Sequence, residues 1–323
     1  MAVQEQIQDK GWTSKYILLV SPLLINGNVT MSRVEKLLRF IRLGKKQMTE
    51  DKNICVIMRV YNSERFIEEA LDSVFKQKFW STIYLTILYD EGTTDSSLKI
   101  LQNIIPNEKI QVDIIKHPHT TASLAILYTQ KINKLCDYYC FLDYDNYYAE
   151  NYLSTVIKYI TTNEIDFLFS PIYIVDSNGF VIEKALHKIQ KFPKYKILGG
   201  PFIDMNTIVL SKIAFCYIIE KLNTISKYFF YWFHEDWVIG ALAIYNFKYG
   251  MLKSSYVYYR WHENNINFRS KDKEASAIKS LNTRLLIAKL TFSNLTVLGK
   301  LYLYLHIIKD ITSLFLHFLM REN

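Results

Sequence analysis

The sequence is poor in the residues that build flexible linkers and disulfide frameworks. Its 323 residues include only 10 glycines, 6 prolines and 4 cysteines. So few glycines and prolines argue against long disordered linkers. Cys136 and Cys140 have no second cysteine or histidine pair nearby, which argues against a zinc site. Cys55 and Cys140 lie within apolar runs, so we expect buried free thiols and a reducing compartment.

The sequence also lacks a secretion signal and a clean membrane span. No basic segment followed by a cleavage site opens the chain, and apolar Tyr16–Ile25 is too short to cross a bilayer. Leu298–Met320 is long and apolar, but polar residues interrupt it at Lys300, His306, Lys309 and Asp310. We therefore expect a cytoplasmic protein whose C-terminal segment either lies in a membrane interface or is buried against the domain.

Motifs for nucleic-acid binding are absent too. The net charge of +8 is compatible with nucleic acid, anionic lipid or phosphorylated substrates as partners. The lysines and arginines are dispersed, and no zinc-finger or RNP-like motif is present, so we expect no nucleic-acid partner. With 50% hydrophobic residues, the chain can form one large domain with appendages, or two domains.

A change of composition near Asp51 marks the start of the main domain. Residues 1–50 are predicted to form an extension, in which Ser32 and Glu35 make a capping box that opens a basic amphipathic helix. That helix could lie on an anionic membrane or pack on its own domain. We predict a main domain over residues 51–270 and C-terminal helices over residues 271–323.

Strands and helices alternate through the first part of the main domain. Apolar runs predict strands at 53–58, 83–89, 112–115 and 138–142. Helical periodicity predicts helices at 63–77, with Ser63 as N-cap, and at 96–104 and 121–135. This alternation predicts an α/β fold with a mostly parallel sheet, right-handed crossovers and helices on both faces, and a ligand site at the carboxyl ends of the strands.

The second part alternates less regularly. Helices are predicted at 151–161 and 211–222, from about 236 to 244, and from Glu274 onward. Strands are predicted at 167–175 and 256–262, with a hairpin turn at 176–179 and a loop at 194–201.

Two carboxylates, Asp143 and Asp145, directly follow the fourth predicted strand. Side chains at positions i and i+2 of a strand face the same way, so both can converge on one point. Such a pair suits a hard divalent cation that carries phosphates. Aspartate and asparagine also turn the chain after strands, and taken alone this pair favours the turn.

Further polar clusters end other apolar elements. They comprise Arg59–Asn62, Asp90–Asp95 and Arg260–Asn265, and His234–Asp236 opens a helix. Several such clusters in a parallel-sheet pattern indicate a shared site. Glu235 and Asp236 are also residues that a helix N-terminus favours through the macrodipole. The aromatic run Tyr228–Phe233 before them favours a functional role, although an aromatic core would have the same composition.

In order and spacing, these motifs resemble those of the family-2 glycosyltransferases with the GT-A fold, over residues 53–266. The corresponding segments are Tyr61-Asn62, Ile67–Gln77, Asp90-Glu91-Gly92-Thr93-Thr94-Asp95, Asp143-Tyr144-Asp145, Glu235-Asp236 and Tyr259–Asn265. The sequence departs from the family at Arg59-Val60, where Pro-Thr is usual, and at Glu91, where a second aspartate is usual. Ala122–Thr129 carries no arginine for the diphosphate, so Arg59, Lys116 or Arg260 could supply that charge.

The resemblance implies a Rossmann-like, mostly parallel sheet flanked by helices, with helical N- and C-terminal extensions. Residues 51–146 would be the nucleotide-binding half and residues 147–270 the acceptor half. The implied reaction moves a sugar from a nucleotide-diphosphate donor, with uridine as the nucleoside, to a hydroxyl of a glycan or lipid-linked glycan in cell-surface polysaccharide biosynthesis. It would use Mn²⁺ or Mg²⁺ and invert the anomeric centre by single displacement.

The resemblance also implies residue roles. Asp236 would be the catalytic base, with Glu235 as the alternative. The nucleotide would be bound by Arg59, Tyr61, Asn62, Glu64, Asp90, Glu91, Asp143 and Tyr144. Asp145 would bind the metal with Asp143, and His262 would be a further ligand, a diphosphate contact or a packed histidine. By position, the donor and acceptor pocket would include Gly200, Pro201, Asp204, Trp237 and Arg260.

Alternative functions remain open at this point. A catalytically inactive GT-A-like binding or scaffold protein is favoured by the departures at Arg59 and Glu91, and disfavoured by the intact aspartates. A sugar nucleotidyltransferase would need a glycine-rich phosphate loop, which Arg59–Asn62 is not. A processive synthase is disfavoured because Gln-x-x-Arg-Trp and a transmembrane bundle are missing. The mixed apolar and basic segment 284–321 predicts peripheral attachment to a membrane surface, beside a lipid-linked acceptor.

Overall fold

The computed structural model describes residues 52–78, 82–132, 136–185, 193–226, 233–263, 265 and 273–319. The chain divides into two units, Met1–Asp51 and Lys52–Asn323, and every described residue belongs to the second. The predicted N-terminal extension and its basic helix lie outside the described residues. The predicted domain boundaries therefore stay predictions.

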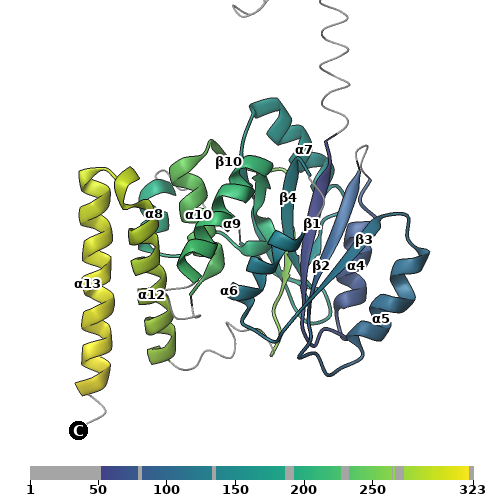
Figure 1. Cartoon of the computed structure of the whole chain (residues 1–323), viewed down its shortest axis with the longest axis horizontal. Helices are drawn as coiled ribbons and strands as arrows, with labels where there is room; N and C mark the ends of the chain where they lie inside the picture. The colour runs from purple at the N-terminus through teal and green to yellow at the C-terminus, as the bar shows by residue number, and fades with distance from the viewer. Residues whose placement is uncertain are drawn as a thin grey trace, which may run out of the picture. The chain divides into compact units, whose positions relative to one another are not determined.

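A mixed sheet of seven strands forms the centre of the unit (Figure 1). Its order is β10 (Tyr249–Met251), β6 (Phe167–Phe169), β9 (Val209–Ser211), β4 (Tyr138–Asp143), β1 (Ile54–Val60), β2 (Ile83–Asp90) and β3 (Gln111–His117). Only β9 runs antiparallel to its neighbours within this sheet. The predicted α/β fold with a mostly parallel sheet is confirmed.

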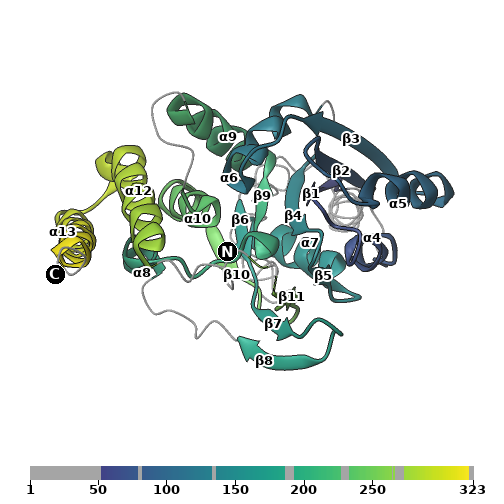
Figure 2. The ribbon, with the colours of Figure 1, turned by 90° about the horizontal axis from the view of Figure 1, so that it is seen from below.

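Strand β1 is buried on both faces, which explains its continuous apolar run. Cys55 and Ile57 face one hydrophobic cluster, whereas Ile54, Val56 and Met58 face the other. Helices α4 (Ile67–Phe75), α5 (Ser97–Ile104) and α7 (Tyr152–Asn163) cover the second face, and α9 (Lys212–Ser226) and α10 (Glu235–Asn246) cover the first (Figure 2). The strand therefore holds its carboxyl end rigidly between two packed layers.

The strand register brings the polar clusters together. In the pairing of β1 with β4, Arg59 lies opposite Asp143. In the pairing of β2 with β3, Asp90 lies opposite His117. All four strands end at the same edge because they run parallel, so polar residues from distant parts of the sequence share one site.

A smaller sheet of four strands lies beside the first. It contains β5 (Tyr147–Tyr148), β11 (Val257–Arg260), β7 (Ile172–Val175) and β8 (Val181–Ala185), in that order. The predicted hairpin between β7 and β8 is confirmed, and Gly179 there has a φ of +87°, which favours glycine. The predicted single strand 167–175 is wrong: Ser170 and Pro171 separate β6 from β7, because proline cannot donate a ladder hydrogen bond.

Two further predictions differ from the structure. The predicted helix 121–135 is a short helix α6 (Ala122–Ala125) followed by the 3₁₀ helix η2 (Ile126–Lys131). Its last residues, 133–135, lie outside the described chain. The predicted loop 194–201 is helix α8 (Pro193–Gly199), since a proline suits the first turn and Ile197 and Leu198 are buried. The remaining 3₁₀ helices are η1 (Ile105–Asn107), η3 (Met205–Thr207) and η4 (Phe292–Asn294).

The buried free thiols predicted at Cys55 and Cys140 are confirmed. Cys55, Cys136 and Cys140 are buried, whereas Cys216 on α9 is exposed. Burial raises the pKa of the Cys140 thiol above its usual range, so this group stays protonated.

The chain continues as two long helices, α12 (Lys273–Thr291) and α13 (Val297–Leu319), which confirms helical structure beyond Glu274. Arg284 of α12 donates hydrogen bonds to the carbonyls of Leu198 and Gly199 at 2.9 and 2.8 Å and pairs with Asp310 of α13 at 2.5 Å. Helix α13 lies at the edge of the unit, beyond α12 (Figure 1). Within the described ranges, no helix is long and apolar enough to cross a membrane.

Candidate active site

A cavity of about 1090 Å³ opens at the carboxyl ends of β1, β2 and β4. It is lined by Arg59–Asn62, Leu88, Asp90, His117, His119–Ala125, Asp143–Asn146, Asp204–Asn206, His234–Asp236, Tyr259, Asn265 and Lys279. This is the edge at which the alternation of strands and helices predicts a ligand site. The volume is sufficient for a ligand of nucleotide-sugar size.

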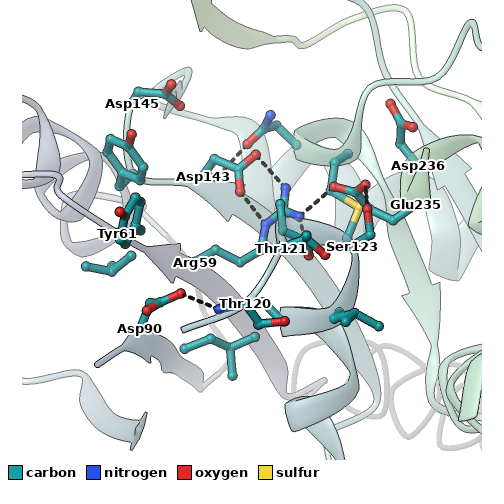
Figure 3. A pocket seen from close by; sticks show the side chains of 18 of the residues that line it. Arg59, Tyr61, Asp90, Thr120, Thr121, Ser123, Asp143, Asp145, Glu235 and Asp236 are labelled. Atoms are coloured by element: carbon teal, nitrogen blue, oxygen red, sulfur yellow. Dashed lines mark hydrogen bonds and ion pairs between the residues drawn. The ribbon is translucent and has the colours of Figure 1, made fainter. Parts of the chain in front are cut away.

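Arg59 is the charged centre of this cavity (Figure 3). Its Nε and Nη2 donate to the two carboxylate oxygens of Asp143 at 2.7 and 2.8 Å. Its Nη1 donates to Glu235 Oε1 at 2.6 Å and to the Ala122 carbonyl at 3.0 Å. The planar fork of arginine therefore joins the strand end of β4 to the start of α10.

Both carboxylate oxygens of Glu235 accept hydrogen bonds. Its second oxygen accepts a hydrogen bond from Ser123 Oγ at 2.9 Å, and Ser123 also donates to the Phe233 carbonyl at 2.7 Å. Burial alone would raise the pKa of Glu235, but the adjacent Arg59 charge holds it at about 2. Glu235 is thus a permanently ionised partner of Arg59, which makes it a poor proton acceptor.

Asp236 has a different environment, although it is the next residue. Its Oδ1 accepts a hydrogen bond from the Trp237 backbone N at 2.7 Å, and its side chain lines the cavity beyond Glu235 (Figure 3). Burial raises the pKa of Asp236 to about 8, and the carboxylates of Glu235 and Asp204 act in the same direction. A carboxyl group that titrates near neutral pH is suited to take a proton from a bound molecule.

Asp145 lies on the opposite side of Asp143 from Glu235 (Figure 3). Its Oδ2 lies 3.1 Å from His262 Nε2 and 3.3 Å from Asn265 Nδ2, and its Oδ1 accepts from Asn146 Nδ2 at 2.8 Å. Burial raises the pKa of Asp145, which the hydrogen bond from His262 partly offsets.

Carboxylate and imidazole groups are among the ligands that divalent cations accept, but Asp145 lines the cavity whereas His262 is buried outside its lining. Within the described residues, no group of three or more histidine, cysteine, aspartate or glutamate side chains could hold a metal ion. Asp143 faces Arg59 with both oxygens, so this geometry gives it the role of an arginine partner more than that of a metal ligand.

A buried loop supports the strand end of β4. The Asp143 backbone N donates to Asn206 Oδ1 at 2.6 Å, and Asn206 donates from its N and Nδ2 to Asp204 Oδ1 at 2.9 and 2.8 Å. Burial raises the pKa of Asp204 to about 6, against the effect of these hydrogen bonds. Asp204 therefore lines the cavity, as predicted by position, and also orders the backbone of Asp143.

The other end of the cavity is built around Asp90. Its Oδ1 accepts from the Gly92 N at 2.8 Å, and its carboxylate lies 3.1 Å from His119 Nδ1 and accepts from the Thr120 N at 3.2 Å. The Tyr61 ring lies 4.9 Å from the His119 ring. A Cβ at position 92 would lie 2.7 Å from His119 Nδ1, so the close approach requires glycine.

The predicted site residues divide into two groups. Those that line the cavity are Arg59, Tyr61, Asn62, Asp90, Asp143, Tyr144, Asp145, Asp204, Glu235 and Asp236. The predicted residues outside its lining are Glu64, Glu91, Gly200, Pro201, Trp237, Arg260 and His262. Glu91 is exposed, and Glu64 accepts a hydrogen bond from the Ser96 N at 2.9 Å, so neither side chain lies at the cavity.

Arg260 and Trp237 are buried outside the cavity lining, where other groups bind their side chains. Arg260 is 2% exposed, pairs with Glu69 and donates to the Ser177 carbonyl at 3.0 Å. Its backbone N donates to Asn146 Oδ1 at 2.9 Å, which supports the loop of Asp145 from outside. The buried Trp237 donates from Nε1 to the Ile197 carbonyl. Arg260 therefore supplies no charge to the cavity, and neither does the exposed Lys116 on β3.

Several lining residues were not predicted. They include His119, Thr120, Thr121, Ser123, Asn206 and Lys279, whereas His234 and Asn265 belong to polar clusters that the sequence assigns to a shared site. The polar run that follows β3 is another cluster at a strand end, which could have indicated the first of these. No pattern in the sequence indicates Lys279, because it lies on a helix more than 40 residues after Asp236.

Comparison with known proteins supports the resemblance. The model of Glycosyl transferase family 2 matches residues 55–221, which is more than half of the chain. The poly(ribitol-phosphate) beta-N-acetylglucosaminyltransferase TarP of Staphylococcus aureus is 26% identical over 211 residues. That match covers 64% of this chain and 62% of TarP, so the chain spans less than two thirds of this relative.

Solved structures share the fold. The crystal structure of S. aureus TarS 1–349 in complex with UDP-GlcNAc has a TM-score of 0.50 and 16% identity, and the match covers 81% of each chain. The mannosyltransferase PcManGT of Pyrobaculum calidifontis, in complex with GDP-Man and Mn²⁺, has a TM-score of 0.51 and 11% identity, covering 81% of this chain and 74% of that one. At these identities the likeness shows a common fold.

Proposed function

The chain belongs to glycosyl transferase family 2, and on this basis we propose that it transfers a sugar from a nucleotide-diphosphate donor, with UDP as the nucleotide, to an acceptor hydroxyl. The observation that carries the proposal is the arrangement of three carboxylates along one cavity. Asp90 lies at one end, Asp145 contacts His262 at 3.1 Å, and burial raises the pKa of Asp236 to about 8.

Asp236 acts as the base in this proposal. Its ionised carboxylate accepts the proton of the acceptor hydroxyl while the hydroxyl oxygen bonds to the anomeric carbon. The bond from that carbon to the diphosphate breaks, and the nucleoside diphosphate leaves with the electron pair. A single displacement of this kind inverts the anomeric centre. Glu235 does not compete as base, because Arg59 and Ser123 bind both of its oxygens.

Asp145 and His262 would hold Mn²⁺ or Mg²⁺ together with diphosphate oxygens. A bound cation of this kind neutralises charge that develops on the leaving diphosphate. Asp145 is anchored for this role by Asn146 and Asn265, which fix the orientation of its carboxylate.

For the acceptor we propose a glycan or a lipid-linked glycan of a cell-surface polysaccharide. The support is the name of the relative TarP, which acts on poly(ribitol-phosphate), a polymer with hydroxyl groups. The sugar in the donor is proposed to be a hexose or an N-acetylhexosamine, on the same ground.

One observation favours an inactive binding protein instead. Arg59 occupies both oxygens of Asp143, the first aspartate of the Asp-x-Asp pair. In such a protein, nucleotide sugars would bind without turnover, and Asp236 could be replaced without loss.

The proposal predicts that UDP-sugars stabilise the protein in a metal-dependent way. At a concentration of about 100 Kd, a ligand adds about 2.7 kcal/mol, which for a domain of this size raises Tm by about 5–10 °C. We expect such a shift with UDP-N-acetylglucosamine or another UDP-sugar plus Mn²⁺, measured by differential scanning fluorimetry. Asp145→Asn should abolish the Mn²⁺-dependent part of the shift.

Two controls make this measurement decisive. Asp72→Asn changes an exposed aspartate on α4 that pairs with Lys76, and it should keep the full shift. GDP-mannose in place of the UDP-sugar tests whether UDP is the nucleotide of the donor. If no nucleotide sugar shifts Tm with or without Mn²⁺, the proposed function is wrong.

We also propose that α13 attaches the protein to an anionic membrane surface. Its outward face exposes eight large apolar side chains: Val297, Leu298, Leu301, Tyr304, Leu305, Ile308, Ile311 and Phe315. At 3.6 residues per turn they span an arc of about 140°, and Lys300 and Lys309 lie about 20° beyond its two edges. Asp310 points to the other side and pairs with Arg284.

The charges on this face favour lipid over a second copy of the chain. An amphipathic helix with lysines at both edges places its apolar arc among acyl chains and its ammonium groups among anionic headgroups. Two such faces packed together would bring lysines of both copies close to each other. The lipid surface would also hold the enzyme near a lipid-linked acceptor.

Vesicle flotation tests this attachment. The double variant Leu301→Glu/Leu305→Glu should bind phosphatidylglycerol vesicles more than about tenfold more weakly, because each carboxylate would enter an apolar interface. Ile213→Glu is the matched control, since Ile213 on α9 is 72% exposed and lies outside α13. Unchanged flotation of the double variant, or a dimer that this variant dissociates, would refute the attachment.

A further inference from the structure

Helix α12 reaches the cavity although it belongs to the C-terminal segment. Lys279 of α12 is one of the lining residues. One turn later, Thr283 Oγ1 accepts a hydrogen bond from the His234 backbone N at 2.9 Å, directly before α10 begins. Thr283 is fully buried, and Arg284 binds the end of α8 and lies 4.8 Å over the Trp237 ring. The helix is therefore fixed to the segment that carries Asp236.

The cavity lining is rich in carboxylates and poor in permanent cations. Its acidic residues are Asp90, Asp143, Asp145, Asp204, Glu235 and Asp236, and its lysines and arginines are Lys279 and Arg59. Arg59 forms ion pairs with Asp143 and Glu235. Lys279 is the remaining lysine or arginine of the lining, and it shares the cavity with Asp236, Glu235 and His234.

We propose that Lys279 is a positioning residue that assists proton abstraction by Asp236 across the shared cavity, so that α12 is part of the catalytic site. This inference rests on the proposed function of Asp236 as the base. It also separates the roles of the two C-terminal helices: α12 completes the active site, whereas α13 carries the outward apolar face.

The groups around Asp236 determine the direction in which loss of Lys279 shifts the pKa of Asp236. Burial opposes ionisation of Asp236 most strongly, and Glu235 from α10 and Asp204 from the loop before η3 act in the same direction. The Trp237 backbone hydrogen bond and Lys279 from α12 favour ionisation. His234, at the start of α10, has a pKa lowered to about 4 by burial and by Lys279, so it is neutral near pH 7. Arg59 is neutralised locally by its own two carboxylates. A base works in its deprotonated form, so loss of Lys279 should move the acidic limb of the activity profile to higher pH.

The first test measures UDP release from UDP-N-acetylglucosamine by hydrolysis, with water in place of the acceptor, between pH 6 and pH 10. Lys279→Met should move the acidic limb of kcat/KM upward by about half a pH unit, which means about threefold lower activity at pH 7 and recovery toward pH 9.5. Lys279→Arg should keep the profile of the parent. Lys289→Met, on the same helix but outside the cavity lining, is the matched control.

Three outcomes of this test would overturn the inference. They are an equal loss at every pH, a higher KM for the donor with an unmoved limb, and a Lys279→Met profile identical to that of the parent. A parent protein without hydrolysis or donor binding would instead count against the proposed function.

A second test does not depend on activity. In a double-mutant cycle of Lys279→Met with Asp236→Asn, followed by chemical denaturation, the two sites should be coupled at pH 9, where Asp236 is ionised. The coupling should disappear at pH 5.5, where Asp236 is protonated. Equal coupling at both pH values would show a purely structural contact and overturn the inference.

Discussion

Replacing Asp236 by asparagine is expected to lower the rate of sugar transfer by about 10²- to 10⁴-fold, which is the usual contribution of a positioned base. The change removes the proton acceptor but retains the size of the side chain and one oxygen for the Trp237 backbone hydrogen bond. The rate should be measured as UDP release under saturating donor. Tm should stay the same or rise, because a buried carboxyl with a raised pKa is replaced by a neutral amide.

The controls for this prediction separate chemistry from binding. The Tm shift caused by a UDP-sugar with Mn²⁺ should persist in Asp236→Asn. The variant Glu235→Gln tests the neighbouring carboxylate. It should be less stable than the parent, because the ion pair with Arg59 is lost, and it should keep more activity than Asp236→Asn. If Asp236→Asn retains the parental rate, Asp236 is not the base and the inactive-protein alternative gains support.

The largest expected effect on stability is that of Arg59→Met. The Arg59 side chain is 15% exposed, and those of Asp143 and Glu235 are 24% and 12% exposed. Removing the guanidinium leaves two poorly solvated carboxylates without their cation, which typically costs about 3–5 kcal/mol. For a domain of this size, this corresponds to a fall in Tm of about 6–20 °C. Thermal and urea unfolding would measure it.

A double variant provides the control. Glu235→Gln removes one of the two stranded charges, so Arg59→Met/Glu235→Gln should be less destabilised than the sum of the two single variants. Strict additivity would mean that Arg59 and Glu235 do not interact energetically, contrary to their 2.6 Å contact.

The sequence predicts the structure best where a strand is buried on both faces of the sheet, because such a strand is a continuous apolar run. The run around Ile54–Met58 predicts a central strand because every side chain in it is buried, and such a strand must end in polar residues at the sheet edge. The lining positions of Arg59, Asp143 and Asp145 follow from strand order alone. Strand order does not show that Asp90, and not Glu91, lines the cavity. Adjacent residues at a strand end point in opposite directions, and the following turn decides which of them faces the cavity.

Other features depend on tertiary partners that lie far away in the sequence. Arg260 has the charge expected of a diphosphate contact, but it is buried outside the cavity lining and pairs with the half-exposed Glu69, nearly 200 residues earlier. The segment 194–201 has the glycines and proline of a loop, yet burial of Ile197 and Leu198 makes most of it a helix. Lys279 could not be predicted as a lining residue, because the packing of α12 on the start of α10 alone brings it to the cavity.

The double attachment of Arg59 limits how the protein can open. Its partners are supplied by β4 and by α10, which belong to the two predicted halves of the catalytic domain. A hinge motion that separates these halves would have to withdraw Glu235 from a buried guanidinium, so rigid-body opening at this point is energetically unfavourable. We therefore expect a donor to enter through the mouth of the cavity, by local movement of the segments that line it, while the two halves remain one body throughout turnover.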